Sequence, residues 1–166
     1  MKTIILAGGC FWGVEAYFSR IKGVLDTTVG YTDGDSENPS YQEVCQSSGH
    51  VEAVKVVFDE KQLSVPSILD HFFRFVDPTA FNRQGHDIGV QYRSAIFYTD
   101  EDDCSIIEHY LSELQKKYTK KIYTYVKQAT PFYDAETYHQ DYLFKNPTGY
   151  CHVDLSLLRK NELKEE

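Results

Sequence analysis

A cysteine placed directly after two glycines is the residue in this sequence best suited to do chemistry. Cys10 follows Gly8 and Gly9, and an apolar, strand-like run at residues 3–7 precedes the glycine pair. Apolar side chains at helical spacing follow Cys10, so the pattern predicts that this cysteine begins a helix. First-turn backbone N–H groups and the helix dipole favour a thiolate over a thiol. We therefore predict a nucleophilic Cys10 with a lowered pKa; a cysteine buried only for packing is the alternative.

Two aromatic residues and a glutamate could complete such a site. Phe11 and Trp12 follow Cys10 at a helix start, where amphipathicity would bury only one of them, so they form either core or an apolar wall for a ligand. Glu52 lies on the apolar side of the alternating run 51–58. A carboxyl group there has a raised pKa and can act as a general acid near neutral pH. The alternative is an edge-strand glutamate that reaches solvent.

Length and charge exclude several functional classes. The chain has 166 residues, which suits a single domain, and we expect residues 1–166 to form one catalytic unit. Its formal net charge of −8 disfavours binding to nucleic acid or to anionic membranes. No apolar run approaches the roughly 18 residues of a membrane span, and the N-terminus does not resemble a signal peptide. We therefore expect a cytoplasmic protein.

The cysteines are far apart in sequence and form no Cys-x-x-Cys pair. They are Cys10, Cys45, Cys104 and Cys151. In a reducing compartment, such thiols are more often buried, catalytic or redox-active than joined in structural disulfides. A zinc site drawing on Cys45, His50, Cys151 and His152 is the competing interpretation, and the absence of closely spaced ligand pairs disfavours it.

Strands and helices alternate along the chain and would position these residues. We expect strands at residues 3–7, 25–31, 51–58, 94–98 and 122–128, and helices at 10–22, 65–76 and about 100–118. This order favours an α+β fold with helices packed on a mixed sheet. Segments 32–40 and 77–93 lack clear periodicity, and we interpret them as walls of the site. The charged end, residues 159–166, is expected to be a solvated tail.

Eight short motifs occur in order between the first strand and Cys151. They are Gly8-Gly9-Cys10-Phe11-Trp12-Gly13, Tyr41-Gln42-Glu43-Val44-Cys45, Gly49-His50-Val51-Glu52-Ala53-Val54, Asp77-Pro78-Thr79, Asn82-Arg83-Gln84-Gly85-His86-Asp87, Gln91-Tyr92-Arg93-Ser94, Tyr138-His139-Gln140-Asp141-Tyr142-Leu143 and Asn146-Pro147-Thr148-Gly149-Tyr150-Cys151. Together they resemble the type A peptide-methionine sulfoxide reductases, which reduce the S epimer of methionine sulfoxide. Val76 and His86 depart from the commoner pattern, at positions that are not catalytic in the family.

The resemblance implies a fold and a set of binding roles. The fold would be a two-layer α/β sandwich with a ferredoxin-like core and long loops around the site. Tyr41 and Tyr92 would donate hydrogen bonds to the sulfoxide oxygen and to nearby water. Asp87 would accept a hydrogen bond from a substrate backbone N–H. Phe11 and Trp12 would receive the substrate methyl group.

The resemblance also implies a catalytic cycle. Cys10 would attack sulfur while Glu52 delivers a proton to oxygen, leaving methionine and a sulfenic acid. Cys151, in a segment with proline and glycine, would resolve that sulfenic acid as a Cys10–Cys151 disulfide, which thioredoxin reduces. Cys45 would be a buried residue near the site. Oxidised proteins and free methionine sulfoxide would be the substrates of a monomer that needs no metal or organic cofactor.

Two other functions compete with this interpretation. A thiol peroxidase also uses a reactive cysteine and forms a sulfenic acid, but a peroxide needs no methyl pocket, so Phe11 and Trp12 would be unexplained. A redox-sensing or peptide-binding module would use Cys10 only to sense oxidant. Catalytic turnover separates these alternatives.

Overall fold

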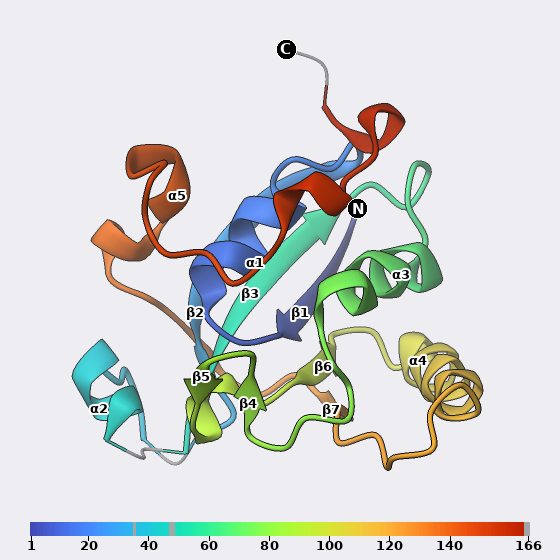
Figure 1. Ribbon diagram of the computed structural model, residues 1–166, viewed down its shortest axis with the longest axis horizontal. Coiled ribbons are helices and arrows are strands. Elements are labelled where there is room, and N and C mark those ends of the chain that lie inside the picture. The colour runs from blue at the N-terminus through green and yellow to red at the C-terminus, as the bar shows by residue number, and fades with distance from the viewer. Residues whose placement is uncertain (35, 47–48, 165–166) are drawn as a thin grey trace.

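A mixed sheet with helices packed against it forms the frame of the protein (Figure 1). The computed structural model describes residues 1–34, 36–46 and 49–164. Within these ranges, six strands form one sheet in the order β7-β6-β1-β3-β2-β8. The pair β6–β7 is parallel, and the other neighbouring pairs are antiparallel. The strands are β1 (Lys2–Ala7), β2 (Val24–Thr32), β3 (Val51–Phe58), β6 (Ala95–Tyr98), β7 (Tyr125–Gln128) and β8 (Phe132–Asp134).

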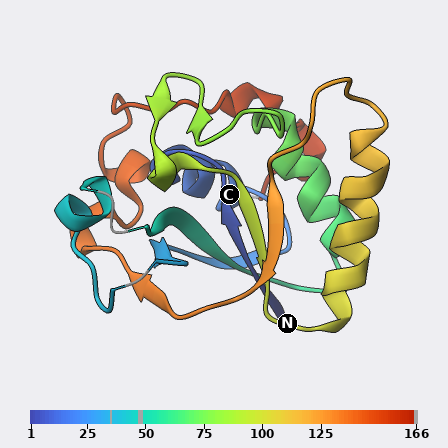
Figure 2. The ribbon, with the colours of Figure 1, turned by 90° about the horizontal axis from the view of Figure 1, so that it is seen from below.

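The helices differ in how they contact the sheet and one another. They are α1 (Phe11–Phe18), α2 (Tyr41–Cys45), α3 (Val65–Phe75), α4 (Asp102–Gln115) and α5 (Tyr142–Lys145). Helix α1 packs on β2 and β3, whereas α4 packs against α3 and β7. The view from below shows α3 and α4 side by side, with the strands to one side of them (Figure 2).

The two faces of the sheet bury different residues because side chains alternate along each strand. Leu6 and Val54 belong to a large core cluster together with apolar residues of α1 and α3. Ile5 and Ala53 point to the other face, where they form a smaller cluster. Glu52 alternates with Ala53, so its carboxyl group lies on the face that α1 covers.

Local sequence signals explain where the longer helices begin. Ser64 caps α3 through a capping box with Ser67, and a proline occupies the first turn, so the expected helix at 65–76 is confirmed. Strand β3 has the bounds expected from its alternation. Helix α1 ends at Phe18, earlier than expected. Helix α4 begins at Asp102.

Several short elements lie in segments for which the sequence predicted no regular structure. The segment 77–93 contains the hairpin β4 (Arg83–Gln84) and β5 (Asp87–Ile88), followed by the 3₁₀ turn η1 (Val90–Tyr92). Strand β8 and helices α2 and α5 were also missed. These elements contain two to five residues, too few to show a hydrophobic period.

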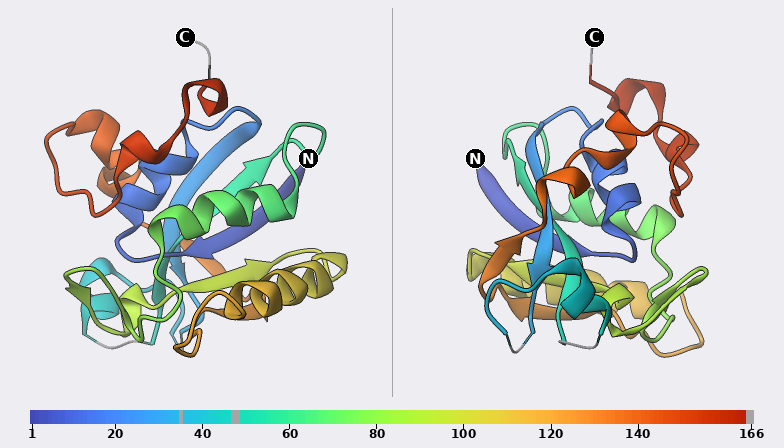
Figure 3. Two further views of the ribbon diagram at one scale, coloured as in Figure 1. Left: turned by 45° about the vertical axis from the view of Figure 1, so that its right-hand side comes forward. Right: turned by 90° about the vertical axis from the view of Figure 1, so that its left-hand side faces the viewer.

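The C-terminal segment packs beside the residues that follow α1 (Figure 3). Leu163 bridges Ile21, and Lys22 donates its backbone N–H to the carbonyl of Glu162 at 2.8 Å. The Glu162 carboxylate pairs with both terminal nitrogens of Arg74, at 2.8 and 2.7 Å. The expectation of a solvated tail is therefore wrong for Glu162 and Leu163, whereas residues 159–161 and 164 are exposed as expected; residues 165–166 lie outside the described ranges. None of the described helices is long and apolar enough to cross a membrane.

Candidate active site

The turn between β1 and α1 places Cys10 at the helix N-terminus, as expected. Gly9 has φ +92°, and a Cβ atom there would lie 2.9 Å from both Gln84 Cβ and His152 Nε2, so no side chain fits. Cys10 is the N-cap residue of α1. The nearby backbone N–H of Trp12 lowers the pKa of its thiol.

The net shift of the Cys10 pKa is nevertheless upward, contrary to the expectation from helix position. Burial raises the pKa most, because the side chain is only 9% exposed, and the neighbouring Glu52 carboxyl raises it further. These two effects outweigh the opposite effect of the Trp12 backbone N–H on the pKa. Burial and Glu52 therefore favour the thiol form of Cys10 over the thiolate.

Glu52 is buried beside the turn between β1 and α1, and its pKa is raised as expected for a general acid. Its Oε1 accepts a hydrogen bond from the backbone N–H of Phe11 at 3.2 Å, and the residue is 1% exposed. Burial raises its pKa to about 8; the Phe11 hydrogen bond opposes this shift, and Asp87 adds to it. Glu52 Oε2 has no hydrogen-bond partner among the described residues. A protonated carboxyl group with one free oxygen can donate a proton to a ligand beside Cys10.

Two tyrosines from separate segments meet near Glu52. Tyr41 begins α2 and Tyr92 ends η1, yet the two side chains lie close enough for Tyr41 to lower the pKa of Tyr92. Burial, followed by the nearby Glu52 carboxyl, raises the pKa of both tyrosines. They therefore remain hydrogen-bond donors across the physiological pH range.

Asp87 and Cys151 also lie near Cys10. Asp87 on β5 accepts a hydrogen bond from the hydroxyl of Tyr150 at 2.9 Å, and its charge raises the pKa of Cys10. Cys151 lies over the first turn of α1: a Cβ atom on Gly13 would be 3.2 Å from Cys151 Sγ. The structure thus brings the second thiol close to the first.

The two aromatic residues after Cys10 have different environments. Phe11 is 1% exposed and belongs to the core cluster. Trp12 is partly exposed, and its indole stacks on Tyr142 with ring centroids 3.7 Å apart and an interplanar angle of 8°. The Trp12 Nε1–H donates to Nδ1 of His139 at 3.0 Å. Of the two, Trp12 offers the ring surface that a ligand can contact.

The other cysteines have different surroundings. Cys45 is exposed, so the expectation that it is buried is wrong; it ends the short helix α2, beside Tyr41, whose hydroxyl it approaches. Cys104 lies on α4, away from Cys10, and its thiol donates to Glu108. Within the described residues no group of three metal-ligating side chains lies together.

The sequence analysis assigned no role to two buried polar residues near the site. His139 is 2% exposed and holds the Trp12 indole, as described above. Glu15 is 2% exposed on α1 and accepts hydrogen bonds from Thr27 and Asp141. A signal for Glu15 was available, because a lone acidic residue among Val14, Ala16, Tyr17 and Phe18 has little chance of reaching solvent.

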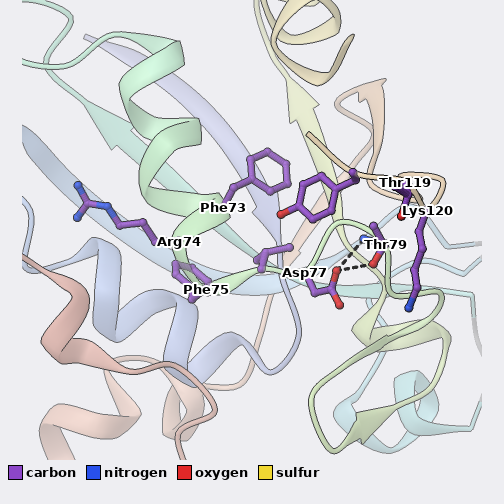
Figure 4. Close-up of a pocket in the computed structure, with 9 residues that line it drawn as sticks. Phe73, Arg74, Phe75, Asp77, Thr79, Thr119 and Lys120 are labelled. Carbon is purple, nitrogen blue, oxygen red and sulfur yellow. Dashed lines mark hydrogen bonds between the residues drawn. The ribbon is translucent and has the colours of Figure 1, made fainter. Parts of the chain in front are cut away.

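A cavity of about 570 Å³ lies elsewhere, between the end of α3 and the residues that follow α4 (Figure 4). Its lining includes Phe73, Asp77 and Lys120 but none of the residues predicted for the site. The Asp77 carboxylate there accepts hydrogen bonds from the backbone N–H and hydroxyl of Thr79. The volume of this cavity therefore does not identify it as the active site.

Comparison with known proteins identifies the family of this chain. The family model described as peptide methionine sulfoxide reductase matches residues 2–166. A peptide methionine sulfoxide reductase MsrA of Clostridium acetobutylicum is 52% identical over 162 residues, 97% of this chain and 100% of that protein. The structure is similar to Mxr1 from Saccharomyces cerevisiae in reduced form, with a TM-score of 0.84, 38% identity and coverage of 90% of this chain and 88% of that one. Mxr1 in complex with Trx2 gives a TM-score of 0.59 at 28% identity, covering 85% and 84% of the two chains. The chain therefore belongs to the peptide methionine sulfoxide reductase family.

Proposed function

We propose that this protein reduces the S epimer of methionine sulfoxide, free or in oxidised proteins, to methionine. The observation that carries the proposal is that the Glu52 carboxyl group lies close to Cys10, at the start of α1. The carboxyl group bonds the N–H of Phe11 through Oε1, leaves Oε2 without a partner among the described residues, and has a pKa of about 8. A buried acid beside a thiol is the pair that sulfoxide reduction requires.

In the first step oxygen passes from the substrate to Cys10. Glu52 donates its proton to the sulfoxide oxygen, which makes the sulfur more electrophilic, and Cys10 Sγ attacks that sulfur as its thiol proton passes to Glu52. The new bond between the two sulfur atoms and the S–O bond of the substrate then break as the hydroxyl moves to Cys10 Sγ, which gives a Cys10 sulfenic acid and methionine. Tyr41 and Tyr92 donate hydrogen bonds to the oxygen as charge develops on it.

Substrate positioning is assigned to the residues around this pair. Trp12, with Phe11 beneath it in the core, receives the methyl group through sulfur and aromatic contacts. Asp87 accepts a hydrogen bond from the substrate backbone, which requires that it exchange or share its bond with Tyr150.

The second step regenerates the enzyme. Cys151, packed against Gly13 on the first turn of α1, condenses with the sulfenic acid to form a disulfide and water. A thioredoxin then reduces the disulfide by thiol exchange. The structure of the related Mxr1 with Trx2 supports this choice of reductant. The chemistry uses only these side chains, with no metal or organic cofactor.

We further propose that residues 1–166 act as one domain, a monomer in the cytoplasm, with a two-layer sandwich and a ferredoxin-like core. The large core cluster between the sheet and the helices, and the smaller cluster on the other face, support the two-layer plan. Repair of oxidised methionine under oxidative stress is the role that follows.

A turnover assay tests the function. The protein is incubated with a peptide that contains S-methionine sulfoxide and, separately, with hydrogen peroxide, using dithiothreitol or thioredoxin as reductant. We expect methionine formation with both reductants in wild type, none in Cys10→Ser, and turnover only with dithiothreitol in Cys151→Ser. Consumption of peroxide without methionine formation would instead identify a thiol peroxidase. Full thioredoxin turnover in Cys151→Ser would exclude this cysteine as the resolving thiol.

A further inference from the structure

The segment that carries Cys151 is fastened to the helix that carries Cys10 by a buried carboxyl group. Glu15 Oε1 accepts a hydrogen bond from the backbone N–H of Asp141 at 2.7 Å, and Oε2 accepts one from the Thr27 hydroxyl at 3.1 Å. Glu15 is 2% exposed, and no ion pair to it occurs within the described residues. Glu15 is therefore held by hydrogen bonds and not by an ion pair.

The anchored turn has a special backbone geometry. Asp141 has φ +54°, in the left-handed region that most residues avoid, so the chain needs support there. Beside it, the Gln140 side chain bonds both the N–H and the carbonyl of Val29 at 2.9 Å, as a neighbouring strand would. The turn is thereby fixed to both α1 and β2.

The chain runs from this turn through α5 to the second thiol, Cys151. Helix α5 begins at Tyr142, whose ring stacks on Trp12, and the chain continues to Cys151, which packs against Gly13. Figure 1 shows α5 and the segment after it lying against α1. Since Cys10 is the N-cap of the short helix that carries Glu15, a fixed turn at Asp141 fixes the origin of the segment relative to the Cys10 sulfur.

We propose that Glu15 is a positioning residue for disulfide formation, holding Asp141 so that Cys151 meets the Cys10 sulfenic acid. This inference rests on the function proposed above. In the step concerned, Cys151 Sγ bonds to Cys10 Sγ, the S–O bond of the sulfenic acid breaks, and its hydroxyl leaves as water with the thiol proton of Cys151. Glu15 touches none of the reacting atoms and acts through the backbone of Asp141.

Two substitutions separate the hydrogen bond from the charge. In Glu15→Gln the amide oxygen can still accept from Asp141 and the NH₂ group can donate to Thr27, so both steps should run at nearly the wild-type rate. Glu15→Leu keeps the volume but accepts no hydrogen bond. A loosened segment should slow disulfide formation about tenfold, as small misplacements of reacting groups do, while the first equivalent of methionine is released within about twofold of the wild-type rate.

The experiment follows both steps in a single turnover. Reduced protein is mixed with an S-methionine sulfoxide peptide, methionine release is measured by chromatography of quenched samples, and the Cys10–Cys151 disulfide by mass spectrometry. Thr27→Val is the matched control, because it removes the other hydrogen bond to Glu15 and leaves Asp141 held; its disulfide rate should equal that of wild type. Should Glu15→Leu not fold, Glu15→Asp, whose carboxylate is one methylene shorter, replaces it with the same expectation.

Several outcomes would overturn the inference. A wild-type disulfide rate in Glu15→Leu, or equal slowing in Glu15→Leu and Thr27→Val, would show that Glu15 only stabilises the fold. Equal slowing in Glu15→Gln and Glu15→Leu would show that charge, and not the hydrogen bond, matters. Absence of methionine release from wild type would instead contradict the proposed function itself.

Discussion

At the scale of one residue, the proposed first step depends on the proton of Glu52. Burial raises its pKa to about 8, so the acid is protonated below that pH and loses its proton above it. Glu52→Gln should slow methionine release by on the order of 10²-fold, as loss of a general acid does. The wild-type single-turnover rate should also show a decline above about pH 8 that is absent from the variant. Matching rates for the two proteins from pH 5 to 9 would contradict the acid role and leave proton delivery to the tyrosines.

The surroundings of the cysteines predict which thiol reacts with a small alkylating agent. Burial raises the pKa of both thiols, but Cys10 is only 9% exposed whereas Cys45 is exposed. Iodoacetamide at neutral pH should therefore label Cys45 before Cys10, because Cys45 is the more accessible thiol. Peptide mapping after limited labelling measures the order, and Cys10→Ser should leave the Cys45 rate unchanged. Faster labelling of Cys10 would mean that the helix N-terminus outweighs burial.

At the scale of elements, Gly13 tests how closely helix α1 and the segment around Cys151 must pack. A Cβ atom there would be 3.0 Å from Val153 Cγ2 and 3.2 Å from Cys151 Sγ, so Gly13→Ala must displace that segment by a few tenths of an ångström. Alanine is otherwise the better helix former by about 1 kcal/mol. We expect turnover with dithiothreitol to be retained and turnover with thioredoxin to fall severalfold. Measuring both reductants on one preparation gives the comparison, and an equal loss with both would indicate damage to Cys10 itself.

Elements with a long hydrophobic period could be predicted from the sequence, and those defined by distant partners could not. The alternation in β3 and the apolar stripe and cap of α3 predicted both elements nearly to the residue. Strand β8 exists because three residues pair with the edge of β2, and nothing within such a short segment specifies that partner. The segment 77–93 was expected to line the site, and β5 and η1 do bring Asp87 and Tyr92 close to Cys10.

The candidate site shows the same division between local and distant causes. The position of Cys10 at a helix start and the raised pKa of Glu52 follow from glycines and alternation in the sequence. The direction of the Cys10 pKa shift does not, because it depends on how deeply Glu52 and the segment around Cys151 bury the sulfur. The anchoring of Asp141 by Glu15 was equally hidden, since those residues are far apart in the chain.

At the scale of the whole molecule, two buried carboxyl groups make the fold weaker as the pH rises. Burial is the main cause that raises the pKa of Glu52 to about 8 and of Glu15 to about 7, compared with about 4.3 in an unfolded chain. At a pH between the unfolded and the folded pKa of each group, the folded protein binds more protons than the unfolded chain. Its free energy of unfolding therefore falls with rising pH. Burial lowers the pKa of His71, His139 and His152, so near pH 6.5 the unfolded chain binds more protons at these positions than the folded protein does, and these histidines make the free energy of unfolding rise with pH up to about pH 7.5.

A comparison with a variant that lacks both carboxyl groups therefore isolates their effect. The double variant Glu15→Gln with Glu52→Gln holds uncharged amides at both positions and keeps the histidines, so its free energy of unfolding should not fall between pH 6.5 and 8. Relative to this variant, we expect the free energy of unfolding of wild type, measured with urea, to fall by on the order of 2 kcal/mol across the same window. The pair Arg74 and Glu162 cannot produce this slope, because their hydrogen bond lowers the Glu162 pKa to about 2 and affects stability only in acid. A wild-type slope that persists in the double variant would mean that other groups titrate on unfolding and that these carboxyl groups ionise near their ordinary pKa.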